Sequence, residues 1–382
     1  MNKELKKIFG IAKKPECRIV GLMSGTSLDG LDIVLCNVSK KSIIQEHFKT
    51  VVFPTEIHTL LHKNRSKEYV SLKEISYLNT VMAIFMADEI LSFLVEKGID
   101  RNTIDLISSH GQTIYHAPNA FPKNTFQIVD GDHLAQKTGI VTISDFRQKH
   151  ISAGGEGAPL AIYLDEFLFT HEHKIRVTLN LGGIANLSII PATLGNQKPL
   201  STDVGPANTL INDAMRIYYN QEFDQDGSVA AKGQIHQELL NKLLLDPFFQ
   251  TNFPKTTGQE LFNMRWVEDV IERYSFDITP QNLVTTLTEL TKKSIHKALQ
   301  GLLGDVRYDL IVSGGGCKNI TLMNGLKEAL PNAQFLPISN FGITSEAKEA
   351  VLMAFLAFNL LHKEPIMLGN ESIHLGKICL PN

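Results

Sequence analysis

The sequence predicts an α/β protein of two domains that share one plan. Its 382 residues are more than twice the roughly 150 residues of an average domain. Short apolar runs typical of buried strands alternate with stretches whose apolar residues recur at helical spacing. A pair of strands joined by a Gly-containing turn occurs at 18–38 and again at 176–190. This repetition indicates an internally duplicated architecture.

The composition is ordinary for a soluble globular protein. The formal net charge is −3, and 43% of the residues are hydrophobic, so we expect no nucleic-acid partner. The Lys-rich N-terminus lacks the apolar core of a signal peptide, and no run of about 18 apolar residues predicts a membrane span. The four scattered cysteines form no CxxC pair, which argues against a zinc ribbon or a disulfide framework. We therefore expect a cytoplasmic protein without membrane contact.

The first turn, between strands at 18–23 and 31–38, has the composition of a phosphate-binding site. Two glycines permit positive φ and a close approach of ligand to backbone, and three hydroxyl groups surround them. Two carboxylates would repel a bare phosphate but suit one that Mg²⁺ accompanies. The glycines are Gly25 and Gly30, the hydroxyl groups belong to Ser24, Thr26 and Ser27, and the carboxylates belong to Asp29 and Asp32. The alternative is a polar hairpin turn with capping side chains.

The rest of the first half extends the sheet and supplies polar strand ends. We treat residues 1–16 as a frayed or surface segment. Polar sequence follows two buried strands, and open α/β sheets place ligands at such carboxyl ends. The expected elements are a third strand at 43–53, a helix at 75–97 ended by Gly98, strands at 103–109 and 140–144 that run into His110–His116 and Asp145–Arg147, and a strand at 126–129.

The domain boundary is placed near residue 150, beside the Gly-rich segment 151–159 and before a helix at 160–169. The predicted domains are therefore 1–150 and 151–382. The first carries the phosphate hairpin and part of a substrate site. The second carries a second Gly turn and a candidate catalytic carboxylate, with its last helix near the domain junction.

Three features of the second half are candidate site elements. Gly182-Gly183 can approach a phosphate, or it can be an ordinary hairpin turn. Asp203 precedes Gly205-Pro206 at the expected start of a helix, where the helix dipole favours an ionised carboxylate. It can be a general base or only an N-cap. Gly314, Gly315 and Gly316 follow a strand at 310–312 and let the backbone lie against a flat ring.

Several other patterns are weaker or absent. No complete GxGxxG and no GxxxxGK[ST] occurs, which argues against a Rossmann cofactor and a Walker-type loop. His110 and His116 have no ligand spacing that favours a transition metal. Helices are expected at 206–218, 282–303 and 345–361, and Glu349 in the last of them precedes an apolar run that suggests partial burial.

Taken in order, these motifs resemble the acetate/sugar kinase–Hsp70–actin superfamily and, within it, the anhydro-N-acetylmuramic acid kinase family. The resemblance covers about residues 18–362. The matching stretches are Met23–Gly30, Ser109–Pro118, Gln127–Gly131, Asp145–Arg147, Ala153–Gly155, Gly157–Pro159, Asn180–Asn186, Asp203 with Gly205-Pro206, Ser313–Gly316 with Asn319, and Glu349-Ala350.

The resemblance implies two ribonuclease H-like, actin/hexokinase-like domains with ATP in an interdomain cleft, and a homodimer. It implies an ATP-dependent kinase that opens 1,6-anhydro-N-acetylmuramic acid with water and phosphorylates O6, in cell-wall recycling. Asp203 would activate the water. The other implied site residues are Gly25, Thr26, Ser27, Leu28, Asp29, Gly30 and Asp32 for the ATP phosphates, with Mg²⁺ at Asp29; Gly182, Gly183, Gly314, Gly315 and Gly316 along the nucleotide; and His110, Gly111, Gln112, Thr113 and Glu349 for the sugar.

The chain departs from the family pattern at Val204, Ala207 and Glu156, where Thr, Gly and Gln are usual. These departures keep open a non-catalytic sensor of nucleotide and sugar. A kinase for a different sugar also stays open. A third alternative is a glycoside hydrolase that uses Asp203 and Glu349 as paired carboxylates.

Overall fold

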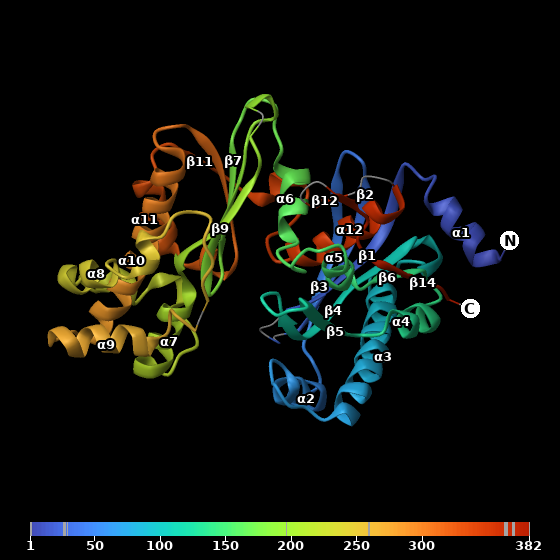
Figure 1. Ribbon diagram of the computed structural model, residues 1–382, viewed down its shortest axis with the longest axis horizontal. Helices are drawn as coiled ribbons and strands as arrows, with labels where there is room; N and C mark the ends of the chain where they lie inside the picture. Colours follow the sequence, from blue (N-terminus) through green and yellow to red (C-terminus); the bar gives the residue numbers. More distant parts are fainter. Residues whose placement is uncertain are drawn as a thin grey trace. The chain divides into compact units, whose positions relative to one another are not determined.

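The computed structural model describes residues 2–25, 28, 30–195, 197–258, 260–362, 366–368 and 371–381. The chain divides into two units, which Figure 1 shows: unit 1 is Met1–Leu164 with Phe341–Asn382, and unit 2 is Asp165–Asn340. This division differs from the predicted one. The first boundary lies after residue 164 rather than 150, and the last helix belongs to unit 1 because it packs on the strands of the first sheet.

Unit 1 combines one large sheet with helices. Its elements are α1 (Lys3–Ile11), β1 (Glu16–Ser24), β2 (Leu31–Ser39), β3 (Ile43–Val51), α2 (Thr55–Asn64), α3 (Leu72–Glu96), β4 (Leu106–Ala117), β5 (Asn124–Ile128), α4 (Gly131–Thr138), β6 (Thr142–Ser144), α5 (Phe146–Ser152), α6 (Ala161–Phe169, which crosses into unit 2), α12 (Lys348–His362), β12 (Ile366–Leu368), β13 (Glu371–Ile373) and β14 (Lys377–Cys379).

Unit 2 has a smaller sheet and a larger share of helix. Its elements are β7 (Arg176–Leu181), β8 (Ile184–Ile190), β9 (Leu200–Pro206), α7 (Asn208–Tyr219), α8 (Gln237–Leu243), α9 (Met264–Tyr274), α10 (Pro280–Leu303), β10 (Tyr308–Ser313), α11 (Ile320–Ala329) and β11 (Ala333–Leu336). Short 3₁₀ turns include η3 (Gln225–Gly227), η5 (Pro247–Gln250) and η6 (Gly315–Lys318).

The two sheets share one strand order. The first runs β14-β6-β4-β1-β2-β3, with β5 paired to β4, and the second runs β11-β10-β7-β8-β9. In each, the first strand pairs antiparallel with the second and parallel with a later strand, β4 or β10. The predicted α/β fold built from a duplicated strand–turn–strand plan is therefore confirmed.

Helix α3 supplies much of the unit 1 core. Its N-terminus is capped by Ser71, whose hydroxyl accepts from Glu74 N, and Gly98 follows its end at φ 67°. Ile75, Leu78 and Met82 are buried in one apolar cluster with residues of β1 and β2. α3 is the one helix within the described ranges that is long and apolar enough to cross a membrane. A buried core helix meets the same criteria, so this is weak evidence for a membrane span.

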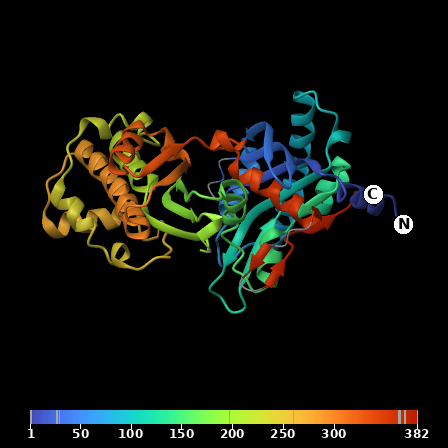
Figure 2. The same cartoon turned by 90° about the horizontal axis from the view of Figure 1, so that it is seen from above.

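Helix α12 covers the middle of the first sheet and packs on β1, β2 and β4 (Figure 2). The contact is close because β1 carries Gly21 here. A Cβ at Gly21 would lie 2.1 Å from Ala350 O of α12. Ser108 Oγ of β4 donates to Met353 O at 2.6 Å. The helix is thus fixed to the sheet both by shape and by a hydrogen bond.

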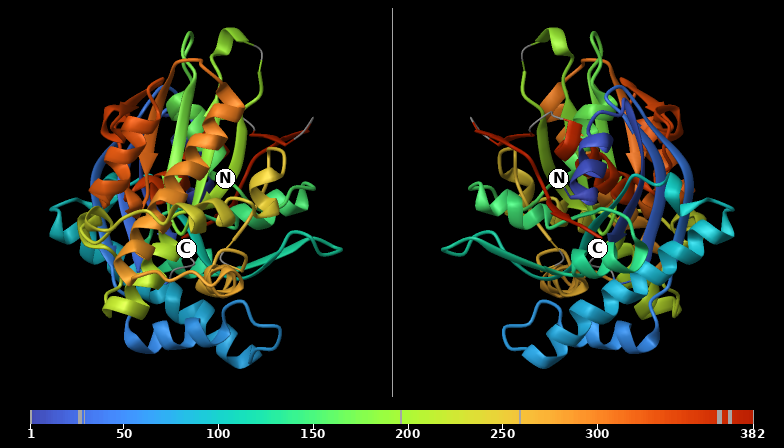
Figure 3. Two further views of the ribbon diagram at one scale, coloured as in Figure 1. Left: turned by 90° about the vertical axis from the view of Figure 1, so that its left-hand side faces the viewer. Right: turned by 90° about the vertical axis from the view of Figure 1, so that its right-hand side faces the viewer.

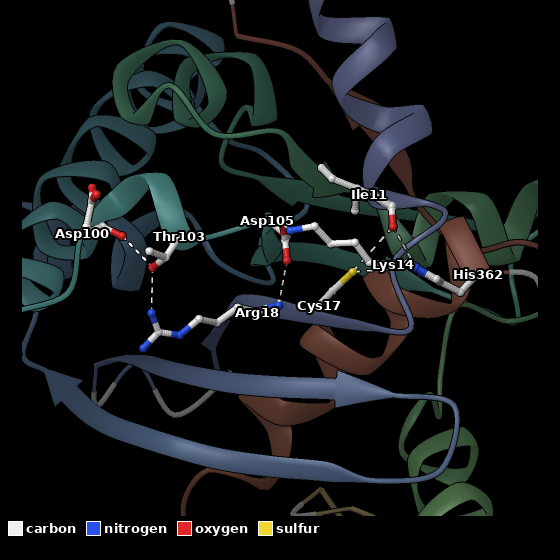
Figure 4. A network of polar contacts seen from close by, with 8 residues as sticks. All are labelled: Ile11, Lys14, Cys17, Arg18, Asp100, Thr103, Asp105 and His362. Carbon is white, nitrogen blue, oxygen red and sulfur yellow. Dashed lines mark hydrogen bonds and ion pairs between the residues drawn. The ribbon is translucent and has the colours of Figure 1, made fainter.

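The N-terminal segment forms a helix on the surface, which is the second alternative of the prediction, rather than a frayed end (Figure 4). Its helix α1 ends at Ile11, whose carbonyl oxygen lies 3.0 Å from His362 Nε2 and accepts from Cys17 Sγ at 3.9 Å. Burial raises the pKa of the Cys17 thiol to about 12. Lys14 Nζ pairs with Asp105 Oδ1 at 2.5 Å. These contacts tie the segment to β4 and to the end of α12.

The helices of unit 2 pack around α10, as Figure 1 shows, and form two apolar clusters. One cluster lies among α7, α8, α9 and the first half of α10, where Phe248, Phe249 and Phe262 stack edge-on or tilted with centroids 5.3–5.7 Å apart. The other lies between the second sheet and the second half of α10. The second sheet is therefore packed against the second half of α10.

Candidate active site

The first turn connects β1 to β2 as predicted, with Ser24 opposite Leu31 in the register. Thr26, Ser27 and Asp29 lie outside the described residues. Leu28 is buried at φ 61°. A Cβ on Gly30 would lie 2.6 Å from Val51 O, so this glycine is required by the neighbouring strand. Asp32 is part of β2, where it accepts from Thr50 Oγ1 at 2.6 Å.

The strand predicted at 103–109 does not end before the polar sequence, because β4 runs on to Ala117. The strand continues to Ala117 because this sequence pairs with β5, and Gln112 also pairs with Ser24 of β1. Figure 3 shows the β4–β5 hairpin extending from the first sheet. Four of the predicted sugar-binding residues, His110 to Thr113, therefore lie on a strand that pairs with the end of β1.

Gln112 holds the first turn in place. Its side chain is fully buried, and its Oε1 accepts from Ser24 Oγ. Its Nε2 lies 3.3 Å from both Gly25 O and Thr113 O. The amide is used within the protein, so its structural role is to join β4 to the end of β1. The preceding Gly111, at φ 73°, allows this path, because a Cβ there would lie 2.3 Å from Ile128 O.

His110 is buried and contacts a residue that was not among the predicted site residues. Arg147 Nε of α5 donates to His110 Nε2 at 2.8 Å, and His110 Nδ1 lies 3.0 Å from Gly111 O. Burial, aided by the Arg147 charge, lowers the pKa of His110 to about 3. The imidazole is therefore neutral and accepts a hydrogen bond from the arginine. Both ring nitrogens are occupied, so His110 is not available to a transition metal.

The structure also places two other residues that were predicted to bind the sugar. Thr113 is buried, and its Oγ1 accepts from Gln127 Nε2 at 3.2 Å. Glu349 is exposed in the first turn of α12, which contradicts the expected partial burial. Burial lowers the pKa of Arg147, and the Glu349 carboxylate opposes that shift. The structure thus brings Glu349 into the electrostatic surroundings of Arg147 and His110.

Asp203 lies within strand β9, whereas the sequence placed it at the start of a helix. The strand runs on through Pro206, and α7 begins at Asn208. Asp203 Oδ1 accepts from Asn186 Nδ2 at 2.9 Å, and Oδ2 accepts from Thr257 N at 2.9 Å. The main chain is also fixed, because Asp203 N donates to Lys255 O at 2.9 Å. The two donors therefore fix the orientation of the carboxylate.

The second Gly turn, at Gly182-Gly183, supports the start of α7. Its carbonyl oxygens accept from the backbone: Asn208 N donates to Gly182 O at 2.9 Å, and Ala207 N donates to Gly183 O at 2.9 Å. The side chain of Asn208 donates to Leu181 O at 2.8 Å. These first N–H groups of α7 are therefore satisfied by protein and are not free to bind an anion.

The three glycines after β10 have different roles, although the sequence analysis predicted that all three lie along the nucleotide. Gly314 adopts φ 86°, and a Cβ there would lie 2.6 Å from Asn180 Oδ1. A Cβ on Gly316 would lie 2.6 Å from Leu181 Cβ. A Cβ on Gly315 would meet only Asn208 Nδ2 at 3.8 Å. The outer two glycines thus serve packing against β7, whereas a Cβ on Gly315 would make only an ordinary van der Waals contact.

The departures from the family pattern lie at packing and surface positions. Val204 and Ala207 are buried in the apolar cluster between the second sheet and α10. Glu156 is exposed, and its Oε1 lies 3.6 Å from Lys123 Nζ. None of the three replaces a donor to Asp203 in the part of the chain that the structure describes. The three departures therefore give less reason to regard the protein as a non-catalytic sensor.

The metal ligand that the sequence predicts belongs to the first turn. The predicted Mg²⁺ ligand, Asp29, lies outside the described residues. Elsewhere in the described ranges, no group of three or more His, Cys, Asp or Glu side chains gathers as a metal site. The structure describes Asp32, which follows the turn in β2. Its carboxylate oxygens are ligands of the kind that Mg²⁺ prefers.

Sequence reasoning missed Arg147, Asn186 and Thr257 as site residues. Arg147 and Asn186 belong to the motifs described above. The sequence does not show that Arg147 contacts His110, or that Asn186 contacts Asp203. The second contact follows from strand register, since Asn186 lies opposite Asp203 in the β8–β9 pair. Thr257 lies in an irregular segment that no pattern singles out.

The chain is similar over nearly its whole length to proteins of one family. The family model described as "Anhydro-N-acetylmuramic acid kinase" matches residues 17–372. The anhydro-N-acetylmuramic acid kinase of Pseudoalteromonas atlantica is 37% identical over the whole of both chains. That of Haemophilus influenzae is 36% identical over 96% of this chain and 99% of its own.

More distant relatives and solved structures are also similar to the chain. The enzyme of the same name from Caldanaerobacter subterraneus is 31% identical over 97% of this chain and 100% of its own. An activator of 2-hydroxyisocaproyl-CoA dehydratase from Clostridium difficile aligns over 90% of this chain and 95% of its own, with 12% identity and a TM-score of 0.43. On the family model and the full-length relatives, this chain belongs to the anhydro-N-acetylmuramic acid kinase family.

Proposed function

We propose that this protein is an ATP-dependent kinase that opens 1,6-anhydro-N-acetylmuramic acid with water and phosphorylates O6. The products are N-acetylmuramic acid 6-phosphate and ADP, and the role is peptidoglycan recycling. The observation that carries the proposal is the fixed carboxylate of Asp203, with one hydrogen bond to each oxygen. It lies in a chain that matches the kinase family from residue 17 to 372.

The chemistry needs one base and one acceptor. Each Asp203 oxygen has a lone pair left after its hydrogen bond, so the carboxylate can take a proton from water. The water oxygen bonds to C1 of the sugar as the C1–O6 bond breaks. The electron pair left on O6 then attacks the γ-phosphorus of ATP, and ADP leaves. No separate general acid is required, because the phosphoryl group takes the place of a proton on O6.

We assign ATP binding to the glycines of the first turn, to Gly182-Gly183 and to Gly315 on the family resemblance. At Gly315 the packing does not require a glycine, because a Cβ there would meet only Asn208 Nδ2 at 3.8 Å. Mg²⁺, held by carboxylates of the first turn such as Asp29 or Asp32, would neutralise charge on the transferred phosphoryl group. We further propose a cytoplasmic homodimer, which rests on the family resemblance alone.

A ³¹P NMR time course with ATP, Mg²⁺ and the anhydro sugar tests this function. We expect a sugar 6-phosphate resonance to grow as ADP forms, and no reaction of the sugar without ATP. Ring opening without ATP would instead support a glycoside hydrolase. Saturable binding of both ligands without ADP release would support a sensor.

A further inference from the structure

The side chain of Lys255 binds the segment that precedes it in the sequence. Its Nζ donates to Phe248 O at 2.7 Å and to Thr251 O at 3.4 Å. The same ammonium stands over two aromatic rings, 4.2 Å from the centroid of Phe248 and 4.6 Å from that of Phe253. Burial, together with the Lys297 charge, lowers the pKa of Lys255. The ammonium has therefore exchanged part of its hydration for carbonyl oxygens and ring faces.

The turn that receives this ammonium, η5, is itself held by two helices. Asp246 caps the turn: its Oδ1 accepts from Phe248 N and its Oδ2 accepts from Trp266 Nε1 of α9, both at 2.9 Å. Lys297 Nζ of α10 donates to Phe249 O at 3.2 Å. Phe248 and Phe249 are buried in the aromatic cluster of unit 2. The turn is thus a fixed support for the lysine.

From Lys255 onward, the chain runs beside β9 and reaches the candidate base. Lys255 N donates to Thr202 Oγ1 at 2.9 Å, and Asp203 N donates to Lys255 O at 2.9 Å. Two residues later, Thr257 N donates to Asp203 Oδ2, also at 2.9 Å. Residues 255–257 form neither helix nor strand. The lysine side chain therefore ties to η5 a segment that has no secondary structure of its own to hold it.

We propose that Lys255 is a positioning residue for Asp203. By tying residues 255–257 to η5, its side chain keeps Thr257 N at the carboxylate and so keeps the orientation of the base. This inference rests on the proposed function, in which Asp203 takes a proton from water. In this role Lys255 acts through Asp203 and needs no contact with the reacting atoms. A base whose support loosens spends less time in the productive geometry, so the rate of the chemical step falls.

The test replaces the ammonium and keeps most of the side-chain volume. We expect Lys255→Met to lower kcat about 10- to 100-fold and to leave both KM values within about threefold, because in this role the lysine binds neither substrate. Lys255→Arg keeps a cation that donates to carbonyl oxygens and stacks on aromatic rings, so it should restore most of the rate. Lys242→Met is the matched control and should keep wild-type kinetics. Lys242 Nζ of α8 also stands over an aromatic ring, 4.2 Å from the Tyr274 centroid.

Two further measurements show whether the lysine acts through the base. In a double-mutant cycle, Lys255→Met should cost no more than about twofold when Asp203→Asn is already present. Amide hydrogen exchange gives a readout that needs no catalysis. The Thr257 N–H should exchange at least about tenfold faster in Lys255→Met than in the wild type or in Lys242→Met. The amides of β7, which lies in the middle of the second sheet, should exchange as in the wild type.

An unchanged exchange rate at Thr257 in Lys255→Met would overturn the inference, and so would an equal loss of kcat with and without Asp203. Faster exchange throughout β7 would also overturn it, because the lysine would then support the whole unit. So would faster exchange at Thr257 with an unchanged kcat. If the wild type turns over no sugar, the kinase assignment fails, and the exchange rates alone decide whether Lys255 keeps Thr257 at Asp203.

Discussion

The first sheet and the second sheet have the same strand order but use their polar side chains differently. In unit 1, Gln112 and His110 are buried on β4 and bound to protein atoms. In unit 2, Asp203 on β9 is held by two donors and keeps lone pairs free. The two units therefore share a strand order, but unit 1 uses it to hold a network of buried hydrogen bonds and unit 2 uses it to hold the candidate base. The comparison shows that strand order alone does not say where the chemistry lies.

The largest effect should come from the base itself. Asp203→Asn keeps the shape and replaces the proton acceptor, so we expect kcat to fall by about 10²- to 10⁴-fold. The thermal unfolding midpoint should change little, because the amide keeps a carbonyl that can accept from a donor. Steady-state ADP release and the unfolding midpoint are the measurements. Activity within tenfold of wild type would mean that unit 2 does not carry the base.

The next largest effect should come from the donor that fixes the base. Asn186→Ala removes the hydrogen bond to Asp203 Oδ1, and we expect kcat to fall about 10- to 100-fold with a smaller change in KM. Ser188→Ala is the matched control, because it removes a cross-strand contact to Ser201 on the same two strands. Equal kinetics for the two variants would contradict a positioning role for Asn186.

Within the Gly loop after β10, packing and open positions should respond differently. Gly314→Ala forces a side chain to φ 86° and a Cβ to 2.6 Å from Asn180 Oδ1, so we expect a loss of about 2 kcal/mol in unfolding free energy. Gly315→Ala should unfold like wild type but raise KM for ATP severalfold. Urea unfolding and ATP kinetics measure both. The reverse pattern would assign the two glycines the opposite roles.

The smallest effect concerns the pH dependence of unit 1. The pKa of His110 is lowered to about 3 in the folded protein, below its ordinary value of about 6.5. Below pH 6.5 the unfolded chain binds a proton that the folded chain does not, so stability falls as the pH falls toward 3. Between pH 6.5 and 5 the loss is at most about 2 kcal/mol.

Urea unfolding of His110→Gln at both pH values tests this, with the exposed His173→Gln as control. His110→Gln should lose part of the pH dependence, and the control should keep it. A wild-type stability that stays constant from pH 6.5 to 5 would contradict a neutral, buried His110.

Local patterns predicted most of the strands, because apolar runs flanked by glycine are distinctive at 18–38 and 176–190. They failed where distant residues decide the structure. β4 is longer than predicted because β5 pairs with its polar half. Asp203 lies in a strand because β9 pairs with β8 through Pro206. Arg147 could be noted as part of a motif, but its contact with His110 depends on how α5 sits beside β4.

The return of the chain to unit 1 has a consequence for its synthesis. Translation runs from the N-terminus, and α12 follows all of unit 2 in the sequence. The first sheet therefore leaves the ribosome without the helix that packs on β1, β2 and β4. Its apolar face stays uncovered until unit 2 has been made, and exposed faces of this kind favour aggregation and chaperone binding. Unit 2, which is continuous in sequence, can complete its own fold first.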